Sequence, residues 1–155
     1  MGPKGVQNHY DLMPLGDVMR VDVESLIDPT GAVVVLWTTS RALWEGDAHL
    51  VLASWHVEPR SLHTWAKAGL GLGRFGRSNT EHFIVATRGV VDVDFRSVPT
   101  IHTWPRGRHS EKPDGFFDMI SEACPSPRIE LFARKRRLGW DAWGNEVESD
   151  WDVPA

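Results

Sequence analysis

The run Ala32-Val-Val-Val-Leu-Trp37 limits the fold of this chain more than any other sequence feature. Its six consecutive residues are apolar, and three of them are β-branched valines. Such a run is typical of a strand that is buried on both faces of a sheet. The turn sequence Asp28-Pro29-Thr30-Gly31 precedes it and gives the strand a defined start. We therefore expect a central strand of a parallel sheet, and with it an α/β fold.

Strand and helix patterns alternate along the rest of the chain. Apolar residues from Trp44 to Trp55 lie on one face of a helix that ends before Pro59. A second helix starts at Pro113 and ends before Pro125. Further strands are expected over 60–66, 81–87, 98–102 and 129–133. This alternation predicts a three-layer, mostly parallel α/β sheet whose ligands bind beyond the carboxyl ends of the strands.

The length of 155 residues, with 41% of them apolar, suits one domain. We place a single domain over residues 1–147 and expect an acidic tail over 148–155 to fray. The lone Cys124 excludes an intramolecular disulfide and is expected to pack in the core. The first residues lack the apolar stretch of a signal peptide, and no apolar run approaches the about 20 residues that span a bilayer. We expect neither secretion nor a membrane segment.

Charge is distributed unevenly along the chain, although the net charge is only −4. Residues 1–59 hold three basic and eight acidic side chains, residues 60–137 hold fourteen basic and eight acidic, and residues 138–155 hold five acidic and no basic. The basic middle is suited to binding phosphates, as in a nucleic-acid partner. A solvated charged surface without a partner is the alternative that composition leaves open.

The glycine-rich segment 69–79 contains the spacing G-x-G-x-x-G from Gly71 onward. In a dinucleotide-binding protein a helix follows this fingerprint, whereas a strand pattern follows it here, so we exclude NAD binding. We expect a mobile loop that closes over a substrate, with Arg74 and Arg77 for phosphates and Phe75 for a base. A plain connection between two strands is an equal alternative.

No metal site is expected from the seven histidines of the chain. His49, His56 and His63 are spaced seven residues apart, but Pro59 prevents a common helix, and no cysteine pair or H-E-x-x-H motif occurs.

Two polar segments stand where ligands commonly bind. Lys112 directly precedes a helix start, where a cation opposes the helix dipole and is better suited to holding an anion. Glu130 and Arg134 lie at the end of a strand, where they are suited to ribose hydroxyls, and Trp140 and Trp143 then offer apolar walls. The alternative is a tryptophan-rich core corner beside a solvated basic run.

Six sequence blocks, taken together, resemble one protein family. They follow the order of the adenine-N6 methyltransferase family named after the seventy-kilodalton subunit that methylates mRNA adenosines, the MT-A family. The resemblance covers residues 8–147 and is greatest to small bacterial and phage members. The blocks are HYDLM (9–13), VVVLWTT (33–39), TWAK (64–67), EHFIVATRG (81–89), HSEKPDGFFDMI (109–120) and RIELFARKRRLGWDAWGNE (128–146).

The resemblance implies a Rossmann-like fold with permuted motif order, S-adenosylmethionine as cofactor, and transfer of its methyl group to adenine N6 in DNA or, less readily, in RNA. It also implies a cytoplasmic location in a bacterial cell or a phage-infected host, and leaves the oligomeric state open. The catalytic residues that it implies are Tyr10, Glu81 and Lys112. The residues implied in cofactor binding are Lys112, Glu130, Arg134, Asn145 and Glu146. For nucleic-acid contacts we expect the basic residues Arg74, Arg77, Arg106 and Arg108.

The chain departs from the family at one place. The family motif Asp-Pro-Pro-Trp, expected upstream of the HYDLM block, does not occur in the sequence. We therefore expect an N-terminally incomplete chain, through a late start or fragmentation, or a protein that binds without methylating. The alternative function is a noncatalytic nucleic-acid-binding or scaffold subunit that retains the methyltransferase fold.

Overall fold

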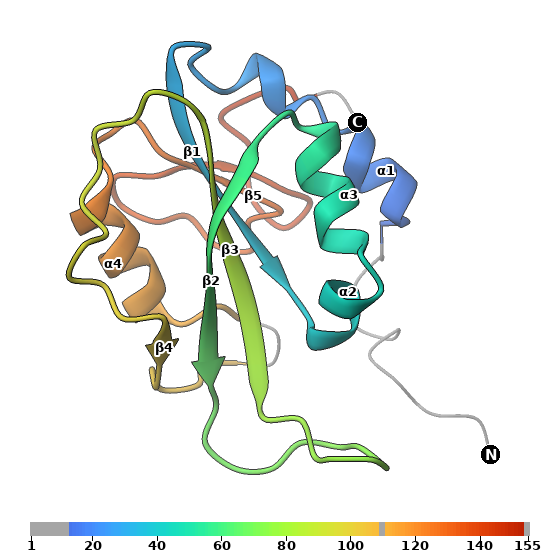
Figure 1. The fold of residues 1–155 in the computed structure, drawn as a ribbon. Helices are drawn as coiled ribbons and strands as arrows, with labels where there is room; N and C mark the ends of the chain where they lie inside the picture. Colours follow the sequence, from blue (N-terminus) through green and yellow to red (C-terminus); the bar gives the residue numbers. More distant parts are fainter. Residues whose placement is uncertain (1–12, 109–110, 154–155) are drawn as a thin grey trace.

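The computed structural model describes residues 13–108 and 111–153. A four-stranded sheet occupies the middle of the molecule, with α1 to α3 beside one face and α4 beside the other (Figure 1). The helices, including one 3-10 turn (η2), are α1 (Leu15–Arg20), η2 (Val23–Ser25), α2 (Ser40–Trp44), α3 (Asp47–Ser54) and α4 (Asp114–Ala123). The strands are β1 (Gly31–Thr38), β2 (Glu58–Ala66), β3 (Thr80–Gly89), β4 (Ile101–His102), β5 (Ile129–Leu131) and β6 (Asp141–Trp143).

The main sheet is mostly antiparallel, so the expectation of a mostly parallel sheet is wrong. Its strand order is β1-β3-β2-β4, and β3 runs antiparallel to both of its neighbours. Among the described strands of this sheet, only the short pair of β2 and β4 is parallel. Strands β2 and β3 are joined by a loop without a crossover helix, and such a connection makes neighbouring strands antiparallel. The apolar run in β1 is therefore an edge strand, not the expected central parallel strand.

The core lies on both faces of β3 and follows the two-residue period of a strand. Ile84 and Ala86 pack with α3, whereas Phe83 and Val85 pack with α4. Strand β1 continues both sets: its even-numbered apolar residues join the first cluster, and its odd-numbered ones join the second. The mixed α/β architecture thus has helices packed on both faces of the sheet.

Most expected elements are present, but the expected helix from Trp44 to Trp55 is broken. Gly46 has a φ of +89°, a left-handed conformation that favours glycine, and it separates α2 from α3. Trp44 is consequently 80% exposed and does not belong to the apolar stripe. The strands expected over 60–66 and 81–87 and the helix after Pro113 are confirmed.

The glycines of the segment 69–79 allow the two arms of the loop between β2 and β3 to lie close together. A Cβ atom added to Gly71 would lie 2.0 Å from the carbonyl oxygen of Ser78, and one added to Gly73 would lie 1.8 Å from that of Gly76. Only glycine allows this close approach of the two arms. The loop leads directly into β3, so the strand expected after the G-x-G-x-x-G spacing is confirmed.

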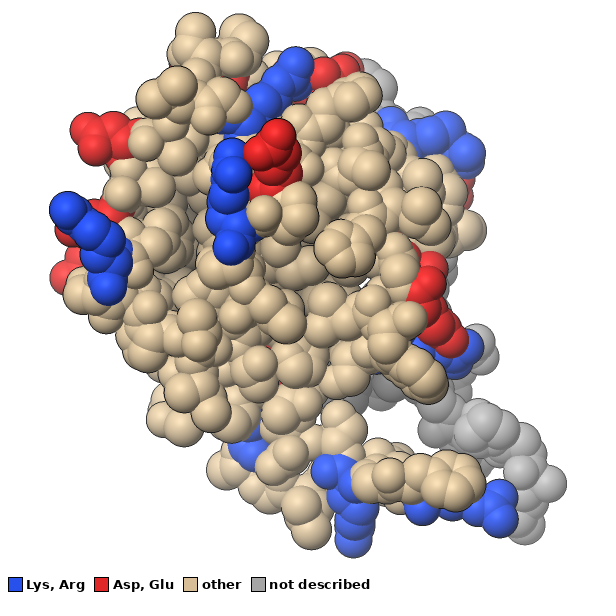
Figure 2. Space-filling model, in the orientation of Figure 1, with Lys and Arg blue, Asp and Glu red and all other residues tan. Residues whose placement is uncertain are grey.

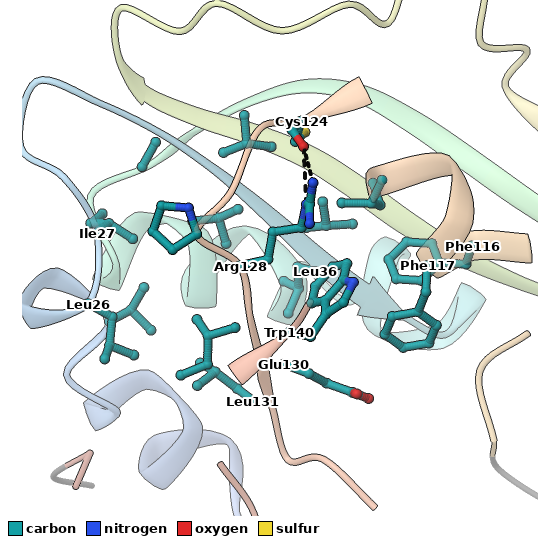
Figure 3. A pocket seen from close by; sticks show the side chains of 18 of the residues that line it. Leu26, Ile27, Leu36, Phe116, Phe117, Cys124, Arg128, Glu130, Leu131 and Trp140 are labelled. Atoms are coloured by element: carbon teal, nitrogen blue, oxygen red, sulfur yellow. Dashed lines mark hydrogen bonds between the residues drawn. The ribbon is translucent and has the colours of Figure 1, made fainter. Parts of the chain in front are cut away.

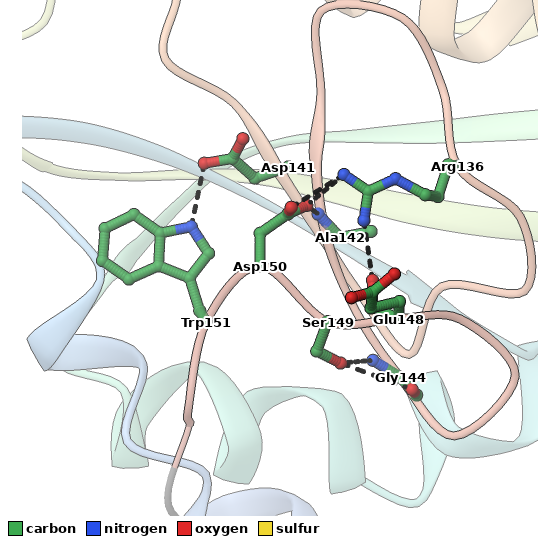
Figure 4. Close-up of polar contacts among 8 residues, drawn as sticks. All are labelled: Arg136, Asp141, Ala142, Gly144, Glu148, Ser149, Asp150 and Trp151. Carbon is green, nitrogen blue, oxygen red and sulfur yellow. Dashed lines mark hydrogen bonds and ion pairs between the residues drawn. The ribbon is translucent and has the colours of Figure 1, made fainter.

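The acidic C-terminal segment packs against the body, so the expectation that it frays is wrong for residues 148–153. The Asp150 carboxylate accepts hydrogen bonds from Arg136 and from the backbone N–H of Ala142, and the Trp151 indole donates to Asp141 (Figure 4). Val153 is only 4% exposed and belongs to the core cluster of α3. These contacts tie the segment to the small parallel sheet of β5 and β6, of which β6 had not been expected.

Within residues 13–108 and 111–153, no helix is both long enough and apolar enough to cross a membrane.

Candidate functional site

A cavity of about 1110 Å³ lies between β1 and β5 (Figure 3). Strand β1 lines it from Gly31 to Trp37, and all three residues of β5 line it from the other side. Apolar walls come from the segment before β1 and from α4, through Leu26, Ile27, Phe116, Phe117 and Ile120. The buried Cys124 also contributes, in agreement with its expected place in the core.

Charged side chains line the part of the cavity near α4 and the loop after β5. Lys135 pairs with Glu111, and Arg137 pairs with Glu130 at 3.6 Å. Arg134 pairs with Glu146 at 3.2 Å. The cavity thus offers carboxylates and cations beside aromatic walls, which is the lining that suits a charged, partly apolar small molecule.

Glu81, at the start of β3, joins two lysines in one ionic cluster beside this cavity. Its carboxylate accepts from Lys67 Nζ at 2.7 Å and from Lys112 Nζ at 2.5 Å. Burial raises the pKa of Glu81, but the ammonium groups of Lys112 and Lys67 outweigh burial and hold that pKa below its usual range. Glu81 is therefore an ionised, half-buried acceptor.

Lys112 connects this cluster to the cavity. It lines the cavity itself, and its Nζ lies 4.6 Å from the ring centroid of Trp37, near the carboxyl end of β1. Because Lys112 directly precedes the N-cap Pro113 of α4, the start of that helix holds it in place. The same ammonium group thus contacts Glu81 and forms part of the cavity wall.

His82 follows Glu81 and is held by two hydroxyl groups. Its Nδ1 lies 3.0 Å from Thr64 Oγ1, and its Nε2 lies 2.9 Å from Ser40 Oγ. Burial lowers the pKa of His82, although the charge of Glu81 acts against this. A neutral imidazole with two hydroxyl partners is a fixed part of the scaffold behind Glu81.

Glu130 has the opposite character to Glu81. Burial raises the pKa of Glu130 above its usual range, despite the cations of Arg137 and Lys135 nearby. The side chain leaves the middle of β5 and lines the cavity (Figure 3). A half-buried carboxyl group with a raised pKa in a cavity is suited to binding a ligand, so Glu130 is a candidate ligand-binding residue.

The structure brings several of the expected site residues together. Lys112, Glu130, Arg134 and Glu146 line the same cavity, and Glu81 contacts it through Lys112. Their expected roles stay predictions. Asn145 is exposed and does not line the cavity, while Tyr10 lies outside the described residues.

The expected nucleic-acid contacts occupy two places. Arg74 and Arg77 are exposed on the loop between β2 and β3, whereas Arg106 and Arg108 are exposed in the segment before α4. Arg108 also lines the cavity. The loop projects from the end of the sheet (Figure 1).

Four cations at or near the cavity were not anticipated from the sequence: Lys67, Arg128, Lys135 and Arg137. Lys67 stands just after β2, in the TWAK block, and only the pairing of β2 with β3 places it at Glu81. The alternative interpretation placed residues 134–137 in a solvated basic run, but the side chain of Arg137 is only 13% exposed and lies over the ring of Phe117. No local pattern distinguishes such a buried arginine from its exposed neighbours.

The comparison with known proteins agrees with these blocks. The sequence model of the MT-A70 family matches residues 4–146. The chain is similar to the Type II methyltransferase M.MunI of Mycoplasma sp, with 32% identity over 145 residues that cover 89% of this chain and 60% of the relative. The chain therefore spans less than two-thirds of the length of this relative.

Proposed function

The chain belongs to the MT-A70 family of methyltransferases, and we propose that it transfers the methyl group of S-adenosylmethionine to the N6 amino group of adenine in DNA. The observation that carries the proposal is the ionised Glu81, which Lys112 links to the cavity. We further propose that the sheet belongs to a three-layer, Rossmann-like fold with permuted motif order.

The cavity residues fit the chemical groups of S-adenosylmethionine. Lys112 and Arg134 are suited to its carboxylate, and Glu130 is suited to its ribose hydroxyls. Trp140 provides an aromatic wall. When bound, this cofactor supplies a methyl group that is activated by a positively charged sulfur.

Glu81 is suited to the adenine amino group because its carboxylate stays ionised near neutral pH. The amino lone pair is delocalised into the adenine ring, and an acceptor for an amino hydrogen favours its localisation on nitrogen. Lys67 and Lys112 hold the carboxylate in one place. Alignment of the reacting atoms contributes up to about 7–11 kcal/mol to such a transfer.

The loop between β2 and β3 is the proposed contact for the nucleic acid. Residues 67–80 contain Lys67, Arg74 and Arg77 and no acidic residue. Phe75 is fully exposed, with a relative exposure of 101%. Blue side chains gather at this loop, at the bottom of Figure 2, with no red among them in this view. Cations that contact phosphates and an aromatic ring that stacks on a base are the usual combination in nucleic-acid binding.

Methyl transfer is tested with labelled S-adenosylmethionine and adenine-containing DNA or RNA. We expect label in DNA, at N6 of adenine, and a fall of about 100- to 1000-fold in the rate of Glu81→Gln, because a neutral amide replaces the ionised acceptor. The matched control is Glu122→Gln, on the exposed surface of α4. Absence of label with every substrate would contradict the proposal, as would equal rates for the two variants.

A noncatalytic nucleic-acid-binding or scaffold subunit is the second candidate, because the exposed Arg74, Phe75 and Arg77 of the loop between β2 and β3 can bind nucleic acid without any reaction. This function requires salt-dependent DNA binding without turnover. Calorimetry separates the two candidates: binding of S-adenosylmethionine that Glu130→Gln weakens supports the enzyme, and a chain that binds DNA but not the cofactor supports the subunit.

A further inference from the structure

The loop between β2 and β3 is held together along its length. At its base, the backbone N–H of Lys67 donates to the carbonyl of Asn79 at 2.7 Å. Further out, Nε of Arg77 donates to the carbonyl of Gly71 at 2.9 Å, from one arm of the loop to the other. The glycines allow the two arms to lie in contact up to the tip. The loop is therefore a narrow, internally braced projection from the end of the sheet (Figure 1).

An apolar ring stands at the tip of the loop, in the sequence Gly73-Arg74-Phe75-Gly76. Phe75 is 101% exposed, and the adjoining Leu72 is 90% exposed. Apolar side chains of this size cost free energy in water, and several of them together on one element commonly mark a contact with another molecule. A plain connection between two strands does not require them.

The charges of the loop favour a nucleic acid as that molecule. Its charged residues are all basic: Lys67, Arg74 and Arg77. Arg74 directly precedes Phe75, so a cation and an aromatic ring are neighbours at the tip. This combination is suited to the phosphates and bases of DNA. A lipid surface or a second copy of the chain would also cover the ring, but neither accounts for the position of the loop beside Glu81.

The loop begins at the proposed adenine site and is long enough to reach the base pairs of a duplex bound there. Lys67, at the base of the loop, pairs with Glu81 at 2.7 Å. The five residues 75–79 between the tip and β3 span up to about 17 Å. The grooves of B-DNA are only about 8 Å deep, and the major groove admits two adjacent strands. A duplex held at Glu81 therefore lies within the reach of Phe75.

We infer that Phe75 inserts into the base stack of duplex DNA and fills the place that the target adenine leaves when it turns out of the helix toward Glu81. This inference rests on the proposed function, because it requires a DNA substrate. Enzymes that modify a base in a duplex take that base out of the stack, and apolar side chains inserted between bases hold DNA in such a deformed state. Arg74 contacts the phosphates beside the opened step, and Arg77 braces the loop that carries the ring.

The test compares two DNA probes of the same mixed sequence, an intact duplex and a duplex with one abasic position. The abasic position already offers a gap in the stack, so the ring enters it without separating bases. We expect the full chain to bind the abasic duplex about 10- to 100-fold more tightly than the intact duplex, as measured by fluorescence anisotropy. The comparison does not require the target sequence, because it is the same in both probes.

Three variants show whether this preference comes from the ring of Phe75. Phe75→Ala should reduce the preference to less than threefold. Arg74→Ala should weaken the binding of both probes alike and keep the preference, because a phosphate contact does not depend on the gap. Trp44→Ala is the matched control, since it removes another exposed ring, on α2 and outside the loop, and should bind both probes as the parent chain does. Thermal unfolding confirms that each variant is folded.

Equal affinity of the parent chain for the two probes would overturn the inference, as would a preference that survives in Phe75→Ala or disappears in Trp44→Ala. It would also be overturned if Phe75→Ala abolished a dimer, or binding to anionic lipid vesicles, and left the DNA preference unchanged. The result is separate from that of methyl transfer. A chain that shows the preference but transfers no label would contradict the proposed reaction alone, and one that labels DNA without the preference would contradict the insertion of Phe75 alone.

Discussion

At the scale of single residues, Glu81 is the carboxylate that joins two lysines at the candidate site. Its carboxylate forms ion pairs with two ammonium groups that come from different parts of the chain, Lys67 after β2 and Lys112 before α4. Both lysine side chains are mostly buried, with exposures of 18% and 29%. Loss of the carboxylate would leave two neighbouring cations without their counter-ion.

Glu81→Gln should lower the free energy of unfolding by about 1–3 kcal/mol at neutral pH, because two charge-assisted hydrogen bonds lose their ionised acceptor. The pKa of Glu81 is below its ordinary value of 4.5 in the folded protein. Its stabilisation is therefore present above pH 4.5 and is lost as the pH falls through the lowered pKa. Urea unfolding at pH 7 and at pH 3.5 measures this, with the exposed Glu58→Gln as control. Equal losses at both pH values would contradict the assignment.

His63 and His102 form a second titratable pair, which is buried away from the cavity. His63 Nδ1 lies 3.1 Å from His102 Nε2, and the two rings stack with Phe83 and Trp104. Burial lowers the pKa of both histidines below 6.5, and for His102 the neighbouring His63 adds to the effect. Both rings are neutral in the stable folded state.

A fall in pH should destabilise the protein through this pair. The unfolded histidines take up protons below pH 6.5 more readily than the folded ones, so the stability present above pH 6.5 is lost as the pH falls through the lowered values. The loss is at most about 1.4 kcal/mol per pH unit for each histidine. Urea unfolding between pH 7.5 and 5 should show a smaller slope in His63→Gln. His49→Gln, on the exposed surface of α3, should keep the slope of the parent chain.

At the scale of elements, the loop between β2 and β3 gives the clearest prediction for nucleic-acid binding. If Arg74 and Arg77 contact phosphates, each alanine substitution should reduce the slope of log affinity against log salt by about 0.9 and weaken binding of all duplex sequences alike. Fluorescence titrations at several salt concentrations measure the slope. Arg96→Ala is the control, because Arg96 is exposed in the segment after β3 and pairs locally with Asp94. An unchanged slope in both loop variants would remove the loop from the interface.

The sequence predicted the elements better than their connections. The apolar period of β3 and the Pro113 signal before α4 act locally, and both elements formed as expected. The prediction of one continuous helix from Trp44 to Trp55 was wrong because the left-handed conformation of Gly46 interrupts an otherwise helical apolar pattern. Strand β6 was missed because three residues leave no recognisable period.

At the scale of the whole molecule, the C-terminal segment joins the small sheet to the main core. Arg136 binds the carbonyl of Glu148 as well as the Asp150 carboxylate, and Ser149 binds the backbone of Gly144 (Figure 4). Val153 then enters the core cluster beside α3. The segment therefore spans from the second sheet to the first.

A chain that stops after Val147 should lose about 3–5 kcal/mol of unfolding free energy. Burial of Val153 accounts for about 1.5–3 kcal/mol of this, and the hydrogen bonds of the segment, most of which are exposed to water, together add about 1.5–2 kcal/mol. Urea unfolding measures the loss. A chain that stops after Val153 keeps every contact described above and serves as the control. A difference below 1 kcal/mol between the two truncated chains would show that the segment does not stabilise the core.

The sequence by itself determined the strands and helices with strong apolar periods, the family, and the blocks from which the candidate site is built. Only the tertiary structure decided that β3 runs antiparallel between β1 and β2, that Lys67 meets Lys112 at Glu81, and that the acidic segment packs. The physical reason is the distance along the chain over which each kind of interaction acts. Apolar period and turn residues report burial within a few positions, whereas strand direction, charge pairing and an open edge depend on segments far apart in the chain.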